Sequence, residues 1–221
     1  MKLVLLLSGG MDSTTLLYDL HDQGHTVYPI TFYYGSRHNN NEVRCASYHV
    51  EHLDLVWNKV DISFLRDILT SALFGDSPMP YGHYDDASMK STVVPFRNRI
   101  LLSIATAYAE SVGAAGVAIA SHSGDHAIYP DCTPNFNRAM ADAMAKGTYG
   151  IIQLYAPYEK LHKGEIASIG RYLGLNYNLT WTCYEGGKYP CGKCGACIER
   201  VEAITFAQAY KGGCAPRAEV I

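Results

Sequence analysis

LVLLLSGGMDSTTLLY, which spans residues 3–18, predicts the architecture of the whole chain. Its first five residues form an unbroken apolar run, which is typical of a strand buried on both faces of a parallel sheet. Beyond the glycines that follow, Leu16, Leu17 and Leu20 recur at the spacing of a helix. A strand that turns through glycines into a helix directs backbone N–H groups at one point, so this point is expected to bind an anion.

The turn between this strand and this helix carries the side chains that a phosphate site needs. Gly9 and Gly10 allow close approach of the backbone, and the hydroxyl groups around them can donate to phosphate oxygens. Asp12 is an acid within this anion site, so we expect it to bind a divalent cation or to start the helix. The plainer alternative is a glycine turn without a ligand. The residues expected to form the site are Leu7, Ser8, Gly9, Gly10, Met11, Asp12, Ser13 and Thr14.

Length and composition limit what the chain can be. Its 221 residues suffice for one sizeable α/β domain, expected at 1–175, and a C-terminal appendage at 176–221. A net charge of −3 and a pI near 6.3 provide no broad basic surface for nucleic acid or an anionic membrane. The N-terminal apolar run is too short for a signal peptide or a membrane span, so we expect a cytoplasmic protein.

Strands and helices are predicted to alternate along the rest of the chain. Apolar runs predict further strands at residues 27–32, 55–62, 116–120 and 150–155. Helical patterns are found at residues 39–53, 100–112 and 133–146, and a last helix is expected to end at residue 173. This order predicts an α/β fold with a doubly wound, mostly parallel five-stranded sheet of the Rossmann type.

The carboxyl ends of parallel strands meet at one edge of a sheet, so the polar loops that follow them should border one site. The loop after the second strand contains Tyr34, Gly35 and Arg37. Arg97 stands in the first turn of its helix, where the dipole disfavours cations, so it indicates either an anionic partner or a surface salt bridge. Lys163, near the start of the last helix, is placed to reach a phosphate.

The loop at residues 121–132 is the most polar of those that follow strands. Asp125 and Asp131 could each accept N–H groups of a purine-like ring or hold a metal ion. His122 and His126 could move protons, although a histidine in a loop is more often a surface residue.

Residues 74–92 interrupt the alternation with many Gly, Pro, Ser and Asp residues, which predicts a long loop of the kind that forms lids or is disordered. His83, Asp85 and Asp86 suggest a metal site there, but a solvated mobile loop is the favoured interpretation.

Seven cysteines are present, and four of them, Cys183, Cys191, Cys194 and Cys197, form the pattern C-x7-C-x2-C-x2-C. Because no export signal precedes them, this clustering favours a metal over disulfides. Four thiolates satisfy a closed, structural zinc site, while an iron–sulfur cluster is the competing interpretation. Three cysteines remain outside the cluster, and Cys45 is expected to be a small buried hydrophobe on its helix. The other two are Cys132 and Cys214.

Several segments together resemble the 7-cyano-7-deazaguanine synthase family of PP-loop ATP pyrophosphatases. They are SGGxDST at residues 8–14, FxYGxRH at 32–38, VPxRN at 94–98, YPDC at 129–132 and the WTCY…CGKCGAC ending at 181–197. The first is not a Walker A loop, because no lysine follows its glycines. The resemblance covers nearly the whole chain. The family commonly has other residues at four positions, which are Met11, Tyr33, Ser36 and Phe96.

This resemblance implies an ATP-dependent reaction of 7-carboxy-7-deazaguanine with ammonia, through adenylated intermediates, to the amide and then to 7-cyano-7-deazaguanine. It also implies Mg2+, one structural Zn2+ per chain, a homodimer, and no nucleic-acid or membrane partner. ATP is implied as the ligand of residues 7–14 together with Tyr34, Gly35 and Arg37. The implied catalytic residues are Asp12, Arg97, Asp125 and Lys163, and the implied substrate-binding residues are Arg97, Asn98, Asp125, Tyr129 and Asp131.

Three other functions are compatible with the sequence. The chain could stop at the amide, as some relatives do. It could be a PP-loop enzyme that modifies RNA, although its acidic balance weighs against an RNA surface. It could also be a non-catalytic module that binds an adenine nucleotide on the same architecture.

Overall fold

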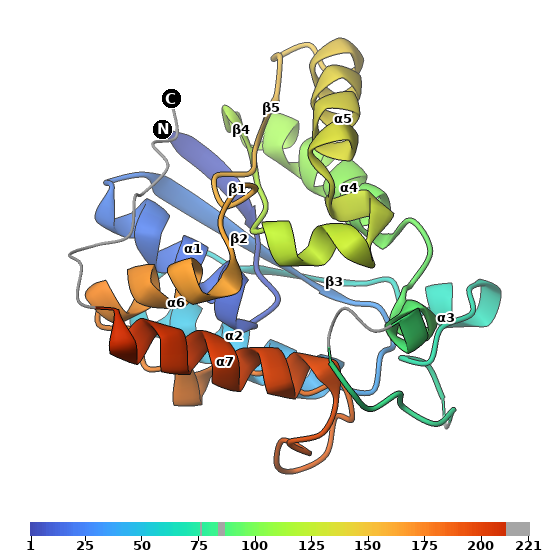
Figure 1. Ribbon diagram of the computed structural model, residues 1–221. Coiled ribbons are helices and arrows are strands. Elements are labelled where there is room, and N and C mark those ends of the chain that lie inside the picture. The colour runs from blue at the N-terminus through green and yellow to red at the C-terminus, as the bar shows by residue number, and fades with distance from the viewer. Residues whose placement is uncertain (76, 84–86, 211–221) are drawn as a thin grey trace.

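The computed structural model describes residues 1–75, 77–83 and 87–210, which form a sheet with helices on both faces (Figure 1). The sheet has five strands, all parallel, in the order β3-β2-β1-β4-β5. The strands are β1 (Lys2–Leu6), β2 (Thr26–Tyr33), β3 (Asn58–Asp61), β4 (Gly116–Ala118) and β5 (Gln153–Tyr155). The predicted doubly wound α/β fold is therefore confirmed.

Helices cover both faces of this sheet. They are α1 (Met11–Asp22), α2 (Asn39–His52), α3 (Leu65–Ile68), α4 (Arg97–Ser111), α5 (Pro134–Gly147), α6 (Lys163–Tyr172) and α7 (Gly195–Ala209). Helices α1, α2 and α6 pack on one face, whereas α4 and α5 pack on the other (Figure 1). Helix α7 packs on α6 and so forms an outer layer on the first face.

Strand β1 is the centre of the core, as its apolar run predicts. Leu3 and Leu5 face the cluster that contains α1 and α6, whereas Val4 and Leu6 face the cluster that contains α4 and α5. Leu3, Val4 and Leu5 have no exposed surface, and burying one such side chain contributes about 2 kcal/mol. The two-sided burial explains why residues 3–6 of this strand are all apolar, whereas Lys2, at its exposed start, is charged.

The order of the strands places the functional site. From β1 the chain proceeds outward to β2 and β3, then crosses over to β4 and β5 on the other side of β1. The loops after β1 and β4 therefore diverge, and an open α/β sheet has its ligand crevice at this switch point, beyond the carboxyl ends of the strands.

Three elements start three residues from where they were predicted, and the other boundaries differ by at most two residues. Strand β3 begins at Asn58 rather than at residue 55, because its pairing with β2 starts there, opposite Ile30, and the backbone N–H of Leu55 donates instead to the carbonyl oxygen of Val50 at 2.9 Å. Strand β5 begins at Gln153 rather than at residue 150, since Ile151 adopts a φ of 51°. Helix α4 starts at Arg97, before residue 100, because a side-chain carboxylate from the loop after β4 accepts the backbone N–H of Asn98.

Two further expectations need correction. The helix that ends near residue 173 is not the last, because α7 follows the cysteines. Within residues 74–92, the described part includes a short 3-10 helix (Ala87–Thr92), and Phe74, Met79 and Met89 are buried in the main core, so this part is not simply a solvated loop. Residues 76, 84–86 and 211–221, with Asp85, Asp86 and Cys214, lie outside the described residues. No helix in the described part is long and apolar enough to cross a membrane.

Candidate active site

A cavity of about 220 Å³ opens at the carboxyl ends of β1, β2 and β4. The loop after β1 and the first residue of α6 line one part of it, and the starts of α2 and α4 line another. The segment around the cysteines closes it with Trp181, Thr182, Tyr184 and Ala196. The cavity therefore joins the predicted anion-binding loop, residues 7–14, to residues from distant parts of the chain. This loop is called the anion loop below.

The loop after β1 is held in a fixed shape by its own hydroxyl groups. The backbone N–H of Ser8 donates to Oγ of Ser13 at 3.2 Å, and the two side-chain hydroxyls are 2.9 Å apart. The backbone N–H of Gly10 donates to Oγ of Ser8 at 3.1 Å. Gly9 has a φ of 81°, and a β-carbon on it would lie 2.2 Å from the carbonyl oxygen of Glu42. Only glycine satisfies both conditions, so this residue allows the loop to lie against α2.

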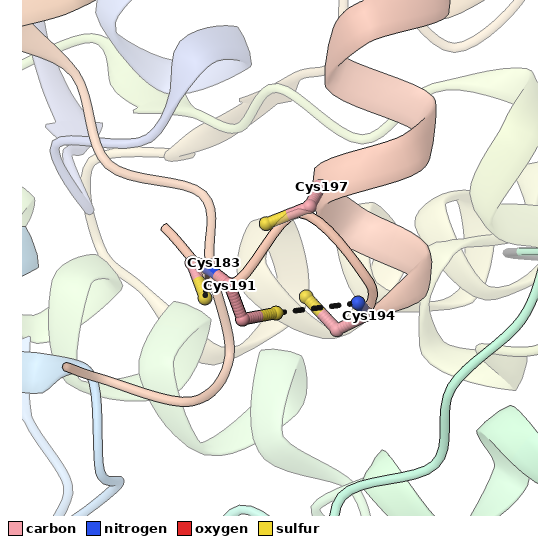
Figure 2. Close-up of side chains that lie close together, drawn as sticks. All are labelled: Cys183, Cys191, Cys194 and Cys197. Carbon is pink, nitrogen blue, oxygen red and sulfur yellow. Dashed lines mark hydrogen bonds between the residues drawn. The ribbon is translucent and has the colours of Figure 1, made fainter. Parts of the chain in front are cut away.

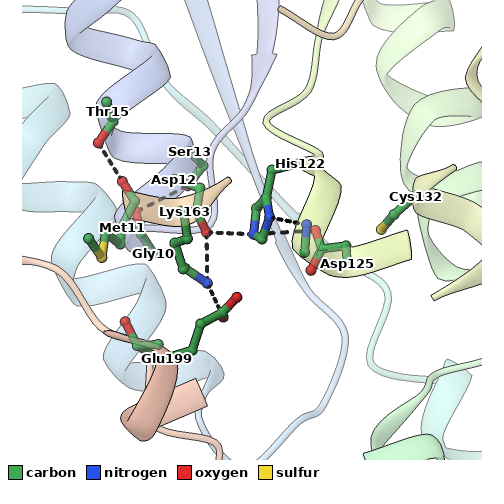
Figure 3. Close-up of polar contacts among 12 residues, drawn as sticks. Gly10, Met11, Asp12, Ser13, Thr15, His122, Asp125, Cys132, Lys163 and Glu199 are labelled. Carbon is green, nitrogen blue, oxygen red and sulfur yellow. Dashed lines mark hydrogen bonds and ion pairs between the residues drawn. The ribbon is translucent and has the colours of Figure 1, made fainter. Parts of the chain in front are cut away.

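Lys163 lies between two carboxylates at the end of the cavity formed by the loop after β1 (Figure 3). Its Nζ is 3.3 Å from Oδ2 of Asp12 and 2.7 Å from Oε2 of Glu199. Burial alone would lower the pKa of Lys163, but attraction to Asp12 and Glu199 outweighs it and raises that pKa. The lysine is therefore a cation directed at the anion loop.

His122 connects Asp12 to Asp125 (Figure 3). Its Nδ1 accepts the backbone N–H of Gly124, which leaves the proton on Nε2. Nε2 is 3.8 Å from Oδ2 of Asp12 and 3.7 Å from Oδ2 of Asp125. This imidazole is 1% exposed, so it is an internal connector rather than a surface histidine.

Asp12 has one oxygen engaged and one free for a cation. Oδ2 contacts Lys163 and His122, whereas Oδ1 is buried and has no hydrogen-bond partner among the described residues. A buried carboxylate oxygen without a partner is costly unless a ligand completes it. The donor set therefore fits a divalent cation that also binds phosphate oxygens.

Arg97 marks a second polar region of the cavity. Its guanidinium lies over the ring of Tyr34, 5.5 Å from the ring centre, and donates to the Tyr34 hydroxyl at 3.3 Å. Burial alone would lower the pKa of Arg97, but attraction to Tyr34, Tyr184 and Asp131 raises it. The alternative of a surface salt bridge is wrong, because no carboxylate of the described residues lies within ion-pair distance of Arg97.

His38 and Glu42 stand beside Arg97 on the cavity wall. Burial, and then repulsion from Arg97, lowers the pKa of His38 to about 3, so this imidazole is neutral. Burial raises the pKa of Glu42 to about 7, although Arg97 and Asn39 partly offset it. The cavity thus contains a carboxyl group that ionises near neutral pH.

The structure brings most of the predicted site residues to the cavity, but not all of them. Those that line it are Leu7, Ser8, Gly10, Met11, Asp12, Ser13, Tyr34, Arg97, Asn98, Asp125 and Lys163. Those that do not are Gly9, Thr14, Gly35, Arg37, Tyr129 and Asp131. Arg37 pairs with Glu185, and Oδ2 of Asp131 accepts the backbone N–H of Asn98 at 2.8 Å.

Several cavity residues were not predicted from the sequence. His38 ends the FxYGxRH segment and Glu42 lies in the helix after it, and neither was assigned to the site from the sequence. Tyr184, which lines the cavity, and Glu199, which contacts Lys163, flank cysteines that were considered only as metal ligands. These residues are far from the anion loop along the chain, so the sequence alone did not indicate that they lie near it in the fold.

The four predicted cysteines converge on one point (Figure 2). Their sulfur atoms all lie within 4.8 Å of one another, and Cys183, Cys194 and Cys197 are buried. The backbone N–H groups of Lys193 and Cys194 donate to the sulfur of Cys191 at 3.4 and 3.3 Å. Such N–H donors stabilise thiolates, so the cluster fits a tetrahedral metal ion.

Comparisons with known proteins agree with this site. A family model described as queuosine biosynthesis protein QueC matches residues 2–208. The 7-cyano-7-deazaguanine synthase of Methanoregula boonei is 50% identical, covering 95% of this chain and 96% of its own length. That of Caldicellulosiruptor saccharolyticus is 49% identical, covering 92% of this chain and 91% of its own.

Solved structures share the fold at much lower identity. NMN synthetase from Francisella tularensis matches with a TM-score of 0.51 and 16% identity, over 92% of this chain and 73% of that one. A 4-thiouridine synthetase, solved with RNA and bound ATP, matches with a TM-score of 0.50 and 17% identity, over 94% of this chain and 53% of that one. The family model and the relatives near 50% identity cover over nine-tenths of the sequence, and the chain therefore belongs to the QueC family of queuosine biosynthesis proteins.

Proposed function

We propose that this chain is an ATP-dependent C–N ligase that converts 7-carboxy-7-deazaguanine and ammonia into 7-cyano-7-deazaguanine. The observation that carries the proposal is the single cavity in which the anion loop, Lys163 and Arg97 all present donors. The names of relatives near 50% identity support the choice of product.

The proposed reaction has two activation steps. The substrate carboxylate resists ammonia because its leaving group would be oxide or hydroxide. A carboxylate oxygen therefore attacks the α-phosphorus of ATP, the bond between the α and β phosphates breaks, and pyrophosphate leaves. Ammonia attacks the adenylated carbon, AMP departs with one proton lost, and the amide forms. The amide oxygen then attacks the α-phosphorus of a second ATP, the bond between its α and β phosphates breaks, and a second pyrophosphate leaves. Loss of AMP and both N–H protons then gives the nitrile.

In this proposal the chain's own residues position groups and neutralise charge. The backbone N–H groups and hydroxyls of the loop at Ser8–Ser13 bind the departing pyrophosphate. Lys163 supplies positive charge to the α-phosphate. Arg97 binds either the carboxylate of the substrate or the phosphate of the adenylate. Asp125, held by His122 near Asp12, completes the proposed catalytic group.

Two metal ions fit the donor sets. Asp12 would hold Mg2+ through its unpartnered Oδ1, where the ion neutralises phosphate charge. Cys183, Cys191, Cys194 and Cys197 would hold one structural Zn2+ per chain. We prefer zinc to an iron–sulfur cluster because the proposed reaction involves no electron transfer.

Other expectations stay predictions. They are free ammonia as co-substrate, a homodimer, a cytoplasmic location, the absence of a nucleic-acid or membrane partner, and the division into residues 1–175 and 176–221. On the last point, the cysteines belong to the same buried cluster as residues of β1 and β2.

Product analysis tests the proposal. The protein is incubated with ATP, MgCl2, ammonium chloride and 7-carboxy-7-deazaguanine, and the products are identified by mass spectrometry. We expect one AMP for the amide step and another for the nitrile step, and a final product one water lighter than the amide. Accumulation of the amide would identify the shorter reaction, whereas ATP binding without AMP release would contradict catalysis. Reaction only with an RNA substrate would indicate the RNA-modifying alternative.

A further inference from the structure

The region of the cavity around Arg97 contains polar groups that the adenylation steps do not use. We define the Glu42 chamber as Tyr34, His38, Glu42, Arg97 and Tyr184, all of which line the cavity. These side chains come from the end of β2, from α2, from the start of α4 and from the cysteine segment. The chamber therefore forms only when the whole fold is assembled.

The carboxylate of Glu42 is held firmly in this chamber. Its Oε2 accepts from Nδ2 of Asn39 at 3.0 Å. Asn39 is itself fixed, because its Oδ1 accepts the backbone N–H groups of Tyr34 and Ser36 at 2.9 and 3.0 Å. The Glu42 side chain is only 15% exposed, so rotation away from the cavity is restricted. A carboxylate positioned in this way is ready to accept further donors.

Among the described residues, no cation within contact distance neutralises this carboxylate. Nε2 of His38 lies 3.7 Å from Oε2, but burial and the nearby Arg97 lower the pKa of His38 to about 3, so the imidazole is neutral. Arg97 attracts Glu42 through space, yet in the described part of the chain the two do not form an ion pair. The chamber thus offers a hydrogen-bond acceptor, Glu42, and a separate cation, Arg97. A ligand that carries both N–H donors and an oxygen acceptor could use both.

The other cavity carboxylates lie beside His122, at the end of the cavity that is proposed to hold phosphate and the metal ion. Among the described residues that line the cavity, the only other acids are Asp12 and Asp125, and both contact His122. Asp131, which the sequence suggested for the base edge, instead accepts the backbone N–H of Asn98 and is not among the lining residues. Glu42 is therefore the acid that remains for recognition of a base.

A carboxylate selects between the two ring systems that enter the proposed reaction. It accepts two parallel N–H donors well, because both of its oxygens are acceptors. The guanine-type edge presents two adjacent donors, the ring N1–H and the 2-amino group. The Watson–Crick edge of adenine places its amino donor beside the acceptor N1, which would face a carboxylate oxygen unfavourably.

We propose that Glu42 binds the N1–H and 2-amino donors of 7-carboxy-7-deazaguanine, so that the Glu42 chamber is the subsite for the base of the substrate. Arg97, in the same chamber, binds an oxygen of that base or its carboxylate. This assignment rests on the proposed function, since it takes its ligand from the proposed reaction.

The test compares two substrates in three proteins. The substrates are 7-carboxy-7-deazaguanine and its analogue without the 2-amino group, 7-carboxy-7-deazahypoxanthine. The proteins are the natural chain, Glu42→Gln, and the control Glu51→Gln, whose carboxylate is on the exposed side of the same helix and accepts from Ser47. Thermal melts establish that each variant is folded, and AMP release gives kcat/KM for each pair.

In the natural chain and in Glu51→Gln, we expect the analogue to lose about 30-fold or more in kcat/KM, the effect of one hydrogen bond to a charged group. In Glu42→Gln, kcat/KM for 7-carboxy-7-deazaguanine should fall by about 100-fold, while the loss caused by removing the 2-amino group should shrink to roughly 5-fold or less. The KM for ATP should stay within about 2-fold of its natural value, because adenine is not the ligand of Glu42.

The outcomes separate this assignment from the proposed function. If the natural chain turns over the carboxylated base but Glu42→Gln keeps the same preference for the 2-amino group, the assignment is wrong and the proposed function stands. A large rise in the KM for ATP in Glu42→Gln would overturn it in favour of an adenine contact. If the natural chain releases no AMP with either compound, the proposed function itself fails.

Discussion

Nζ of Lys163 lies 2.7 Å from Oε2 of Glu199, and this ion pair joins helix α6 to helix α7. Helix α7 also carries Cys197, one of the four converging cysteines, and Cys194 caps its N-terminus. The segment that is expected to hold the metal therefore also holds the lysine that faces the anion loop. Both Lys163 and Glu199 are largely buried, with side chains 9% and 14% exposed.

The pair predicts that Glu199 acts through Lys163. We expect Lys163→Met to lower kcat/KM about 100-fold, because it removes a positioned charge from the transition state. Glu199→Gln keeps an acceptor for the lysine and should lower kcat/KM only about 10-fold. The double variant should resemble Lys163→Met alone, since Glu199 has no partner to position once the lysine is gone. The measurement is steady-state AMP release.

If the loss in the double variant equals the product of the two single losses, Glu199 acts independently of Lys163. Because removing one member of a buried pair leaves an uncompensated charge, the melting temperature of each variant must be recorded beside its activity.

Metal loss should disturb the cavity as well as the cysteine segment. The backbone N–H of Trp181 donates to the carbonyl oxygen of Gly9 at 3.0 Å, which ties this segment to the anion loop. Trp181 is 6% exposed, and its Nε1 donates to the carbonyl oxygen of Cys183. We expect zinc chelation to shift the Trp181 emission to the red and to abolish ATP binding. A Trp57→Phe background leaves Trp181 as the only tryptophan of the chain.

Two cysteine variants provide the control for this experiment. Cys191→Ser removes a proposed ligand and should lose most of the zinc, measured by mass spectrometry of the metal. Cys45→Ser alters a buried cysteine outside the cluster and should retain about one zinc per chain. Equal zinc content in both variants would contradict the four-cysteine site.

The sequence predicted the parts of the molecule that local signals determine. The apolar run of β1, the glycine turn at Gly9 and the spacing of the cysteines each encode their structure within a few residues. Glu42 and Glu199 could not be placed in this way, because their roles depend on contacts between elements distant along the chain. Asp131 shows the converse: it lies next to Asn98, which lines the cavity, but its carboxylate accepts the backbone N–H of Asn98 at the start of α4.

A pair of glycine substitutions separates backbone strain from close packing. Gly9 and Gly24 have nearly the same φ, 81° and 78°, but a β-carbon on Gly24 would meet nothing within 4 Å. Gly24→Ala should therefore cost about 1 kcal/mol of unfolding free energy, from the left-handed backbone alone. Gly9→Ala should cost roughly 3 kcal/mol or more, because the methyl group would also displace the backbone of Glu42 and Ala46. Urea unfolding measures both values, and equal losses would contradict the close packing of the loop on α2.

The buried carboxyl of Glu42 makes stability depend on pH. Burial raises its pKa in the folded protein from 4.5 to about 7, so between these values the folded state keeps a proton that the unfolded state has lost. The stability of the folded state therefore falls as the pH rises through this range, by roughly 3 kcal/mol in total.

Glu42→Gln removes this penalty, because its amide does not ionise. Without nucleotide or substrate, the variant should be more stable than the natural chain by roughly 3 kcal/mol at pH 8, and the difference should be small at pH 4.5, where the natural carboxyl is protonated in the folded state. Urea unfolding at the two pH values measures this difference in stability, and Glu51→Gln, on the exposed side of the same helix, should show no such dependence.

A Glu42→Gln variant that is more stable at pH 8 yet discriminates poorly between the two substrates would indicate that the chain retains a destabilising acid in order to bind the base of its substrate. An equal stability difference at both pH values would mean that Glu42 ionises in the folded protein as it does in water.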